Sequence, residues 1–428
     1  MPCEVPLERR LVERFLRYSA IPSGSVAAVA RAGGPAVVPS SPGQQQLAEG
    51  LAAELRMAGL CDVVCDSHAT VTAVCRGRGV PAGAPRIGFI CHLDTFDCGL
   101  SPVVRPQLQH YTGGDVCLNR EKDLWMRAAA HPELARYVGQ DILFSDGTSV
   151  LGADDKAAVS VVMELVSTLT ASPDFSHGDV VVCFVPDEEI GLIGAKKLNV
   201  RERFNVDFAY TIDCCELGEV VYECFNAATV TLKFVGVSAH PMSAKGVMVN
   251  PLLMAVDYIA LFDREQTPEC TELREGYWWF AGMQANTTEA TLHAMIREHD
   301  LVRFNERKQA MLDAVKTIEQ KYPTGSVHMN IEDVYANISN AINGDPTAIE
   351  LLLDAVRQAG VEPKVIPMRG GTDGAALSAQ GLLTPNFFTG AHNFHSPFEF
   401  LPVPSFVKSF EVALNIVLLG AKRTVKRT

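Results

Sequence analysis

A run of apolar residues that ends in three consecutive carboxylates constrains this chain more than any other feature. Residues 180–185 predict a buried strand, and Asp187, Glu188 and Glu189 follow it after a single proline. Like charges repel one another at this spacing, and partial burial raises the free energy of the ionised forms. A solvated turn would relieve this cost, and so would a bound cation or a reacting proton. The rest of the chain decides between these interpretations.

The pattern of apolar residues predicts alternating strands and helices around this turn. Residues 87–91 and 208–212 are predicted strands, and residues 157–169 have the small and apolar composition of a buried helix. From about residue 224 the pattern changes to strand, helix, two strands, helix and strand. The first of these strands includes residues 229–234, which alternate between polar and apolar as a half-buried antiparallel strand does.

These elements predict an α/β fold with two domains, and a length of 428 residues suits two or three. The first domain has a mixed, partly parallel sheet flanked by helices. The second is an inserted α+β domain with a four-stranded sheet and two helices. We predict residues 1–223 and 336–428 for the first, discontinuous domain and residues 224–335 for the insert.

Composition and charge limit the partners of the chain. Lys and Arg number 37 and Asp and Glu number 50, so the net charge of −13 argues against a nucleic-acid partner. The charged N-terminal residues do not resemble a signal peptide, and no apolar stretch approaches the ~18 residues that span a bilayer. The 12 cysteines are scattered without zinc-finger spacing, which favours reduced thiols. We therefore expect a cytoplasmic protein with no nucleic-acid partner and no membrane partner.

Seven residues that can bind a metal or move a proton lie at predicted strand ends. In open α/β sheets, ligands bind beyond the carboxyl ends of the strands, so these side chains are expected at one edge of the sheet. Each has an ordinary structural interpretation by itself, such as a helix cap for Asp154 or a surface loop position for His395. Their shared position argues against all of those interpretations holding at once. The seven are His92, Asp94, Asp154, Glu188, Glu189, Asp213 and His395.

Two histidines and three carboxylates suit a pair of zinc ions held about 3.5–4 Å apart. In such a site one carboxylate bridges the metals, and each metal receives one histidine and one further carboxylate. Asp154, Glu189 and Asp213 are available as the carboxylate ligands. Glu188 then remains to move protons, and Asp94, two residues after the first histidine, can brace that imidazole.

The stretches around these residues resemble the two-zinc peptidase and aminoacylase family, and in particular its peptidase T branch of tripeptide aminopeptidases. They follow the family's order along nearly the whole chain. The acidic pair and the aspartate-x-lysine motif are general to the family, whereas residues 244–250 and 369–374 resemble the peptidase T branch specifically. The matching stretches are residues 92–95, 151–156, 186–189, 211–213, 240–241, 244–250, 369–374 and 388–390, together with His395.

The resemblance implies a zinc ligand set. It implies that Asp154 bridges two Zn²⁺ ions, that His92 and Asp213 complete one site, and that Glu189 and His395 complete the other. Co²⁺ or Mn²⁺ are the expected substitutes for zinc.

The resemblance also implies residues that act on the substrate. Glu188 is the implied general base, and Asp94 the residue that orients the first histidine. His240, in the insert, resembles a lid histidine that stabilises the tetrahedral intermediate. Arg297 and Arg369 resemble arginines that hold the substrate carboxylate, a task that suits a guanidinium fork. A surface ion pair is the alternative for Arg297.

The resulting hypothesis is a metallo-aminopeptidase that hydrolyses the N-terminal peptide bond of tripeptides by a zinc-bridged hydroxide, with a glutamate as general base. A dipeptidase, a carboxypeptidase or an aminoacylase on the same di-zinc centre is the alternative. A non-catalytic peptide-binding homologue would be expected to lack ligands or the base, and here all are present. Some relatives supply the lid histidine from a partner subunit, so a homodimer stays open.

Two stretches depart from the pattern of the resemblance. Cys214 and Cys215 follow Asp213, where the peptidase T branch has small glycines. A thiol so close to a predicted ligand could perturb the site or bind metal itself. His392 lies three residues before His395 and makes the choice of the histidine ligand less certain.

Overall fold

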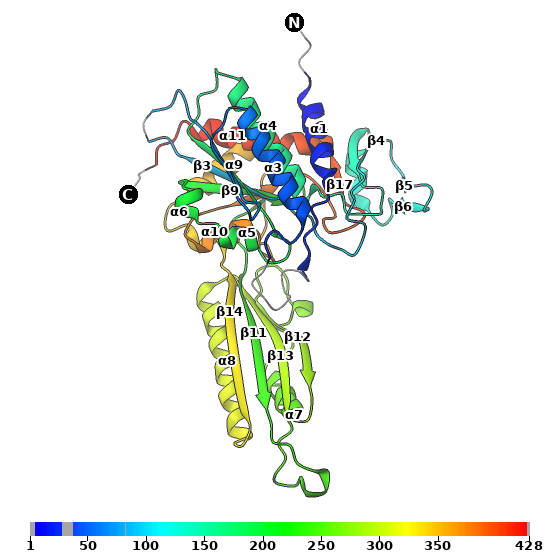
Figure 1. Ribbon diagram of the computed structural model, residues 1–428, viewed down its shortest axis with the longest axis vertical. Coiled ribbons are helices and arrows are strands. Elements are labelled where there is room, and N and C mark those ends of the chain that lie inside the picture. The colour runs from blue at the N-terminus through cyan, green and yellow to red at the C-terminus, as the bar shows by residue number, and fades with distance from the viewer. Residues whose placement is uncertain (1–4, 28–36, 82, 426–428) are drawn as a thin grey trace. The chain divides into compact units, whose positions relative to one another are not determined.

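The computed structural model describes residues 5–27, 37–81 and 83–425, and the chain divides into two compact units. The first unit comprises residues 1–222, 342–366 and 372–428, and the second comprises residues 223–341 and 367–371. The predicted fold class is confirmed, since the first unit contains a mixed sheet with helices and the second a four-stranded antiparallel sheet with two helices (Figure 1). The short segment 367–371 joins the second unit, although it follows the predicted insert in the chain.

The central sheet of the first unit brings four strand ends to one edge. In spatial order its eight strands are β1 (Cys61–Cys65), β2 (Val71–Cys75), β8 (Val180–Val185), β3 (Ile87–His92), β9 (Phe208–Cys214), β16 (Asn386–Phe388), β10 (Glu219–Val221) and β15 (Lys364–Val365). Strand β3 pairs in parallel with β8 and β9, and β9 pairs in parallel with β16. The carboxyl ends of these four strands therefore lie at the same edge of the sheet.

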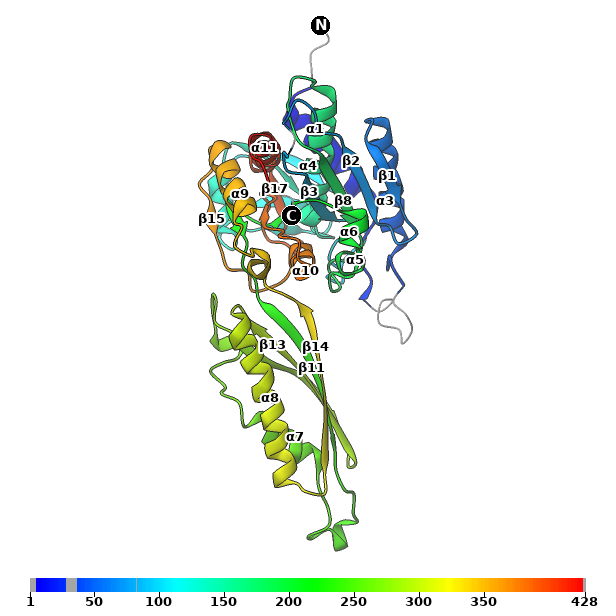
Figure 2. The same ribbon diagram turned by 90° about the vertical axis from the view of Figure 1, so that its left-hand side faces the viewer.

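Helices cover both faces of this sheet (Figure 2). Ile87 of β3 lies against Gly420, whereas its neighbour Gly88 lies against Phe204. Successive residues of a strand point to opposite faces, so these two contacts belong to opposite sides of the sheet. The helices of the unit are α1 (Leu7–Ser19), α3 (Pro42–Met57), α4 (Ala153–Ala171), α5 (Ile193–Lys197), α6 (Val200–Arg203), α9 (Thr347–Gln358), α10 (Asp373–Ala379) and α11 (Val403–Gly420).

Helix α11 is the one described helix that is long and apolar enough to cross a membrane. Of its apolar stretch, 56% is buried inside the protein, where it packs against α1, α4 and α9. Burial of this kind is what a core helix of a folded domain requires.

The segment between β3 and α4 forms small sheets that the sequence analysis did not predict. Strand β17 from the C-terminal part of the chain completes one of them by pairing with β7. Phe144 of β7 and Phe400 of β17 are fully buried in one hydrophobic cluster, which fixes the C-terminal loop to this segment. The elements are β4 (Gln107–Tyr111), β5 (Val116–Asn119), β6 (Leu124–Met126), the 3₁₀ helix η1 (Pro132–Tyr137), β7 (Gln140–Phe144) and β17 (Phe400–Pro402).

The second unit follows the predicted order of strands and helices. Val230, Leu232 and Phe234 are buried against the two helices, whereas Thr231 and Lys233 of the same strand are exposed. This is the alternation expected of a sheet with one covered face. Its strands, in spatial order, are β12 (Tyr277–Ala285), β13 (Glu289–Glu298), β11 (Asn226–Val235) and β14 (Ser326–Tyr335), and its helices are α7 (Pro251–Ile259), α8 (Leu301–Lys321) and the 3₁₀ helices η2 (Pro241–Ser243), η3 (Pro268–Cys270) and η4 (Ile338–Ala341).

Candidate metal centre

The seven residues predicted at strand ends all lie in the first unit, at the carboxyl edge of its parallel strands. His92 is the last residue of β3, the acidic turn follows β8, and Asp213 lies near the end of β9. Asp154 opens α4, and His395 lies in the loop between β16 and β17. The topology of the sheet thus brings together residues that are separated by up to some three hundred positions in the chain.

The carboxylate of Asp154 lies between the two histidines. Its Oδ1 is 2.9 Å from Nε2 of His92, and its Oδ2 is 3.0 Å from Nε2 of His395. The same Nε2 of His395 lies 2.9 Å from Oε1 of Glu189. One carboxylate therefore presents a different oxygen to each imidazole, which is the arrangement that a bridging ligand needs.

Asp94 holds both the first histidine and the acidic turn. Nδ1 of His92 lies 3.0 Å from the backbone oxygen of Asp94 and 3.4 Å from its carboxylate. The two carboxylate oxygens of Asp94 also accept the backbone N–H groups of Glu188 and Glu189, at 3.0 Å and 3.1 Å. The sequence analysis related Asp94 to the histidine alone, whereas the structure shows that it also fixes the backbone of the turn.

Asp187 is the anchor of the acidic turn. Its carboxylate accepts hydrogen bonds from the backbone and hydroxyl of Ser40 and from Nε2 of Gln44, at 2.6–2.8 Å. The backbone N–H of Asp187 in turn donates to Oε1 of Gln44. These contacts engage both oxygens of a buried carboxylate with Ser40 and Gln44, whereas its neighbours Glu188 and Glu189 are grouped with His92.

Burial, together with mutual repulsion, raises the pKa values of three carboxylates of the cluster. Burial, with the charge of Asp154, raises the pKa of Glu189 to about 7 and the pKa of Asp213 well above its ordinary value. Burial likewise raises the pKa of Glu188. Although burial opposes it, hydrogen bonds to Asp154 and Glu189 raise the pKa of His395 to about 10. The site therefore concentrates more negative charge than its own side chains balance, which favours cations.

Four further residues at this site were missed by the sequence analysis. The ring of Phe96 stacks on His395, with centroids 4.0 Å apart and planes 8° from parallel, and so fixes the orientation of the imidazole. Asp155 accepts the backbone N–H of His92. Asp373, at the start of α10, is buried with neither carboxylate oxygen hydrogen-bonded within the described residues. Glu399 accepts backbone N–H groups beside Asp154. The available signals were weak: a carboxylate in an apolar stretch for Glu399, and the glycine turn 369–374 for Asp373.

The second histidine of the C-terminal loop, His392, lies in another environment. It is buried and stacks on Phe400, and its Nε2 lies 2.6 Å from the hydroxyl of Tyr137. Its Nδ1 is 3.6 Å from a carboxylate oxygen of Glu216. We assign the neutral ring, in which Nε2 accepts a hydrogen bond from the Tyr137 hydroxyl and Nδ1–H faces the Glu216 carboxylate. Since both nitrogens are engaged there, His395 remains the histidine that faces Asp154.

The neutral state of His392 predicts a loss of stability in acid. Burial lowers its pKa to about 4 from an ordinary value of 6.5, although the Glu216 carboxylate opposes the shift. Between these values the unfolded chain binds a proton that the folded chain does not, so stability should fall as the pH drops from 6.5 to 4, by up to about 3 kcal/mol. Urea unfolding of metal-free protein at several pH values measures this slope. His392→Gln, which can still accept the Tyr137 hydroxyl, should flatten it, and an unchanged slope would contradict the assignment.

The thiols after Asp213 are not arranged as ligands. Cys214 is buried within β9, and Cys215 is partly buried beside Glu219, whose carboxylate accepts the Cys215 backbone N–H. Burial raises the pKa of both thiols. Among the described residues, neither thiol belongs to a group of candidate metal ligands.

The predicted lid histidine, His240, and the two predicted substrate-binding arginines, Arg297 and Arg369, belong to the second unit. Nδ1 of His240 accepts the backbone N–H of Met242, and the side chain is exposed. The guanidinium of Arg369 lies over the rings of Phe225 and Tyr277, 5.2 Å from each centroid. Arg297 lies 5.6 Å over the ring of Tyr335. Among the described residues neither arginine forms an ion pair. Each guanidinium donates to backbone oxygens and lies over aromatic rings, and Arg369 also donates to the hydroxyl of Thr271.

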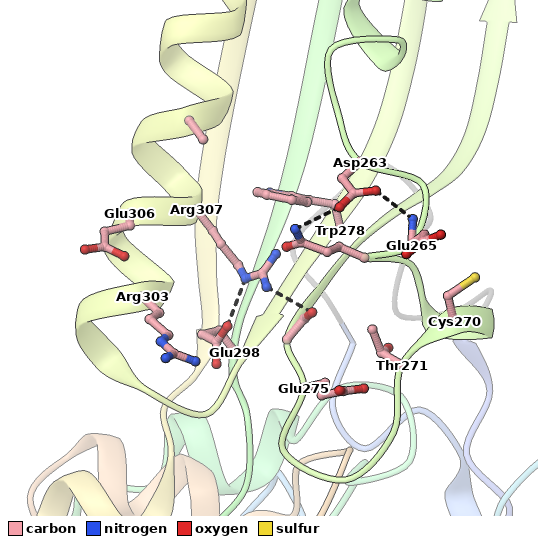
Figure 3. A pocket seen from close by; sticks show the side chains of 13 residues that line it. Asp263, Glu265, Cys270, Thr271, Glu275, Trp278, Glu298, Arg303, Glu306 and Arg307 are labelled. Carbon is pink, nitrogen blue, oxygen red and sulfur yellow. Dashed lines mark hydrogen bonds and ion pairs between the residues drawn. The ribbon is translucent and has the colours of Figure 1, made fainter.

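The second unit also contains a cavity of about 720 Å³ that is unlike the cluster of the first unit (Figure 3). Glu298 and Arg307 form an ion pair of 2.9 Å in its wall, and Arg307 also donates to the backbone oxygen of Gly276. No group of metal-binding side chains is found in this wall among the described residues. We therefore take the cluster at the sheet edge as the functional site.

The donor set of the first unit fits two divalent cations. Imidazole nitrogen and carboxylate oxygen are ligands that zinc prefers in catalytic sites. Three overlapping groups have ligand atoms within 4.8 Å of one another, and Asp154 belongs to two of them. The groups are His92, Asp154, Asp155 and Asp213; His92, Glu188 and Glu189; and Asp154, Glu189 and His395.

Comparison with known proteins gives relatives along the whole chain. The model of peptidase family M20/M25/M40 matches residues 152–419. A Peptidase T-like protein of Yersinia pestis is 56% identical over 418 residues, covering 98% of this chain and 99% of that protein. The Peptidase T of Caldanaerobacter subterraneus is 38% identical over 415 residues, covering 97% of this chain and 99% of that protein.

Solved structures with the same fold cover the chain as completely. The aminopeptidase PepT of Bacillus cereus superposes with a TM-score of 0.74 at 20% identity, covering 97% of this chain and 99% of that one. A tripeptidase of Staphylococcus aureus superposes with a TM-score of 0.73 at 22% identity and the same coverage. Both structures therefore share the combination of a mixed α/β sheet and an inserted α+β unit.

Proposed function

Because this chain belongs to peptidase family M20/M25/M40, we propose that it is a tripeptide aminopeptidase that works with two zinc ions. The observation that carries the proposal is the Asp154 carboxylate, which offers one oxygen to each of two histidines within a buried cluster of acids. The relatives named Peptidase T support the substrate class, and so does the tripeptidase with the same fold.

The proposed ligand set uses the contacts of Asp154. Asp154 would be shared by the two zinc ions, His92 and Asp213 would complete one site, and Glu189 and His395 would complete the other. The 2.9 Å approach of the His395 imidazole to Glu189 supports the second pair, and the grouping of His92 with Asp213 supports the first. Co²⁺ and Mn²⁺ share these preferred ligands closely enough to act as substitutes.

Glu188 is the proposed general base. Bound in this site, the two cations would supply a water of lowered pKa and would polarise the substrate carbonyl. Glu188 takes the proton of the attacking water and returns it to the leaving amine. Its side chain is buried near His92, and its backbone N–H is held by Asp94, which fixes the backbone that carries the carboxylate. Burial raises its pKa, which suits a group that must both accept and release a proton.

His240 is the proposed donor to the oxyanion. In the neutral ring Nδ1 accepts the backbone N–H of Met242, so the proton must lie on Nε2. An exposed Nε2–H on the insert is suited to donate to a developing oxyanion. Arg297 and Arg369 are proposed to bind the substrate carboxylate. The absence of an acidic partner for either guanidinium among the described residues supports this role.

We propose that the enzyme acts in the cytoplasm on short peptides. We further propose that it forms a homodimer if the insert of a partner subunit contributes to the site. The acidic net charge of −13 agrees with an enzyme that has no nucleic-acid partner. Sedimentation of the purified protein with and without zinc tests the oligomeric state, and a monomer would leave the insert of the same chain as the source of His240.

A panel of peptides tests the function. The protein should release the N-terminal residue of a tripeptide such as Ala-Ala-Ala, with little hydrolysis of the dipeptide, the tetrapeptide or the N-acetylated tripeptide. A chelator should abolish turnover, and Zn²⁺ or Co²⁺ should restore it, because the acids of the site need cations to act. Chromatography of the products identifies the bond that is cut. Preferred cleavage of the acetylated peptide would indicate an aminoacylase. Release of the C-terminal residue would indicate a carboxypeptidase, and cleavage of the dipeptide alone would indicate a dipeptidase.

A further inference from the structure

We infer that Glu399 is a positioning residue that holds the Asp154 carboxylate in its direction between the two histidines. The inference rests on the proposed metal centre, but it concerns a residue outside the ligand set. Oε2 of Glu399 accepts the backbone N–H of Gly152 at 2.8 Å, and Oε1 accepts the N–H of Asp154 at 3.1 Å. Glu399 is 1% exposed, and both of its carboxylate oxygens thus accept hydrogen bonds from the backbone around one proposed ligand.

The start of α4 needs this acceptor because its own sequence does not supply one. The first N–H groups of a helix have no partner within the helix, and a capping side chain usually accepts them. Here the residue before the helix is Gly152, at a φ of 73°, and it provides no side-chain cap. Asp154 and Asp155 moreover have non-helical backbone angles, with ψ of 100° and 23°. The direction of the Asp154 side chain is therefore set by a carboxylate that lies 245 residues away in sequence.

Glu399 also belongs to the segment that carries His395. The loop between them is short and has internal hydrogen bonds. The backbone N–H of Glu399 donates to the backbone oxygen of Ser396, and the backbone N–H of Phe398 donates to the hydroxyl of Ser396. Ser145 holds the next residue by donating to the backbone oxygen of Pro397. The loop is thus rigid enough for one side chain to fix the distance between the His395 imidazole and Asp154, which approach to 3.0 Å.

A buried lysine, Lys156, lies within electrostatic reach of Glu399. Lys156 is fully buried in the first turn of α4, and its Nζ donates to the backbone oxygen of Ile21. It interacts electrostatically with Asp94 and Glu399, the two carboxylates that hold backbone N–H groups next to proposed ligands. The two halves of the site are therefore built in the same way, with a carboxylate outside the ligand set bonded to the ligand backbone.

Glu399→Gln tests the role, with Glu164→Gln as the matched control. A glutamine oxygen can accept only one of the two N–H groups, and its amide N–H₂ would face the other, so the segment 152–154 must shift. Glu164 lies on the same helix and is also buried, but among the described residues its carboxylate accepts only from Arg10 and Arg14. Both substitutions replace a buried carboxyl group by an amide, and only the first touches the Asp154 backbone.

The readout is Co²⁺ binding to each purified protein. Titration measures the affinity, and the visible absorption of the bound ion reports its ligand geometry. Glu399→Gln should bind Co²⁺ about 10- to 100-fold more weakly, with an altered spectrum, as expected when a residue that orients a ligand is lost. Glu164→Gln should lower the melting temperature and leave affinity and spectrum as in the wild type. Equal changes in the two variants, or a wild-type spectrum and affinity in Glu399→Gln, would overturn the inference.

A second variant keeps the role testable, and two outcomes for the wild-type protein separate this role from the function of the site. If Glu399→Gln does not fold, Glu399→Asp carries the test, because it keeps both oxygens and the charge but shortens the reach by one methylene. It should bind Co²⁺ more weakly than the wild type, and unchanged binding would overturn the role. A wild-type protein that binds no Co²⁺ overturns the metal centre and the role together. A wild type that binds Co²⁺ but cleaves no tripeptide overturns the proposed function alone.

Discussion

Replacing Glu188 by Gln should lower kcat for tripeptide hydrolysis by about 10³-fold while leaving two metal ions bound. Glutamine has nearly the same shape as glutamate but does not accept a proton near neutral pH, so the attacking water loses its base. The turn itself should persist, because Asp94 holds it through the backbone N–H groups of residues 188 and 189 rather than through their side chains. Metal content by mass spectrometry and kcat at saturating tripeptide measure the two effects separately.

Asp187→Asn in the same turn is the matched control for this experiment. Its carboxylate is bonded to Ser40 and Gln44, which are not among the proposed metal ligands. An amide there would place an N–H₂ group against other donors, which should cost about 1–3 kcal/mol of stability. Its kcat should stay within a few-fold of the wild type when assayed well below the melting temperature. Wild-type turnover by Glu188→Gln would rule out Glu188 as the base, and an equal loss of kcat in Asp187→Asn would trace the effect to the turn.

The sequence predicts that the candidate site residues lie at one edge of the sheet because the topology of the sheet brings separated residues together by rule. Parallel strands end at one edge, so an acid or histidine after β3, β8 and β9 must lie near the others wherever the connecting segments go. Fold class follows from the same alternation of strands and helices, and it is confirmed. The change to alternating residues at 229–234 likewise locates the second unit, because a half-exposed antiparallel strand has a different pattern from a buried parallel one.

What the sequence misses are contacts made by residues that no periodic pattern connects. Asp187 is anchored by Ser40, 147 positions away, and Glu399 by the backbone of Asp154, 245 positions away. Strand β17 pairs with β7 across a similar separation and completes a sheet from strands of only three and five residues. The role of His392 also depends on tertiary structure, since Tyr137 and Phe400 decide that this imidazole packs in a hydrophobic cluster. The periodicity of apolar residues indicates which face of an element is buried, but it does not indicate which polar group contacts that face.

Asp154→Asn should remove at least one of the two metal ions and lower kcat/KM by about 10³-fold or more. A bridging ligand must present an anionic oxygen to each cation, and asparagine offers one neutral oxygen and an amide N–H₂. In the structure that N–H₂ would face the imidazole of either His92 or His395, each within 3.0 Å of a carboxylate oxygen. The loss in rate follows because bound cations supply several kcal/mol of transition-state stabilisation, and each 1.36 kcal/mol is a factor of ten.

The neighbouring carboxylate provides the comparison that makes the result specific to bridging. Asp155 is also buried, but its Oδ2 accepts the backbone N–H of His92, and an asparagine oxygen can keep that bond. Asp155→Asn should therefore bind two ions per chain in a zinc titration followed by calorimetry, whereas Asp154→Asn should bind one ion or none. Two tightly bound ions in Asp154→Asn would show that the metals do not share this carboxylate. Loss of an ion from Asp155→Asn alone would move the proposed ligand from residue 154 to residue 155, since both lie in one group of candidate ligands.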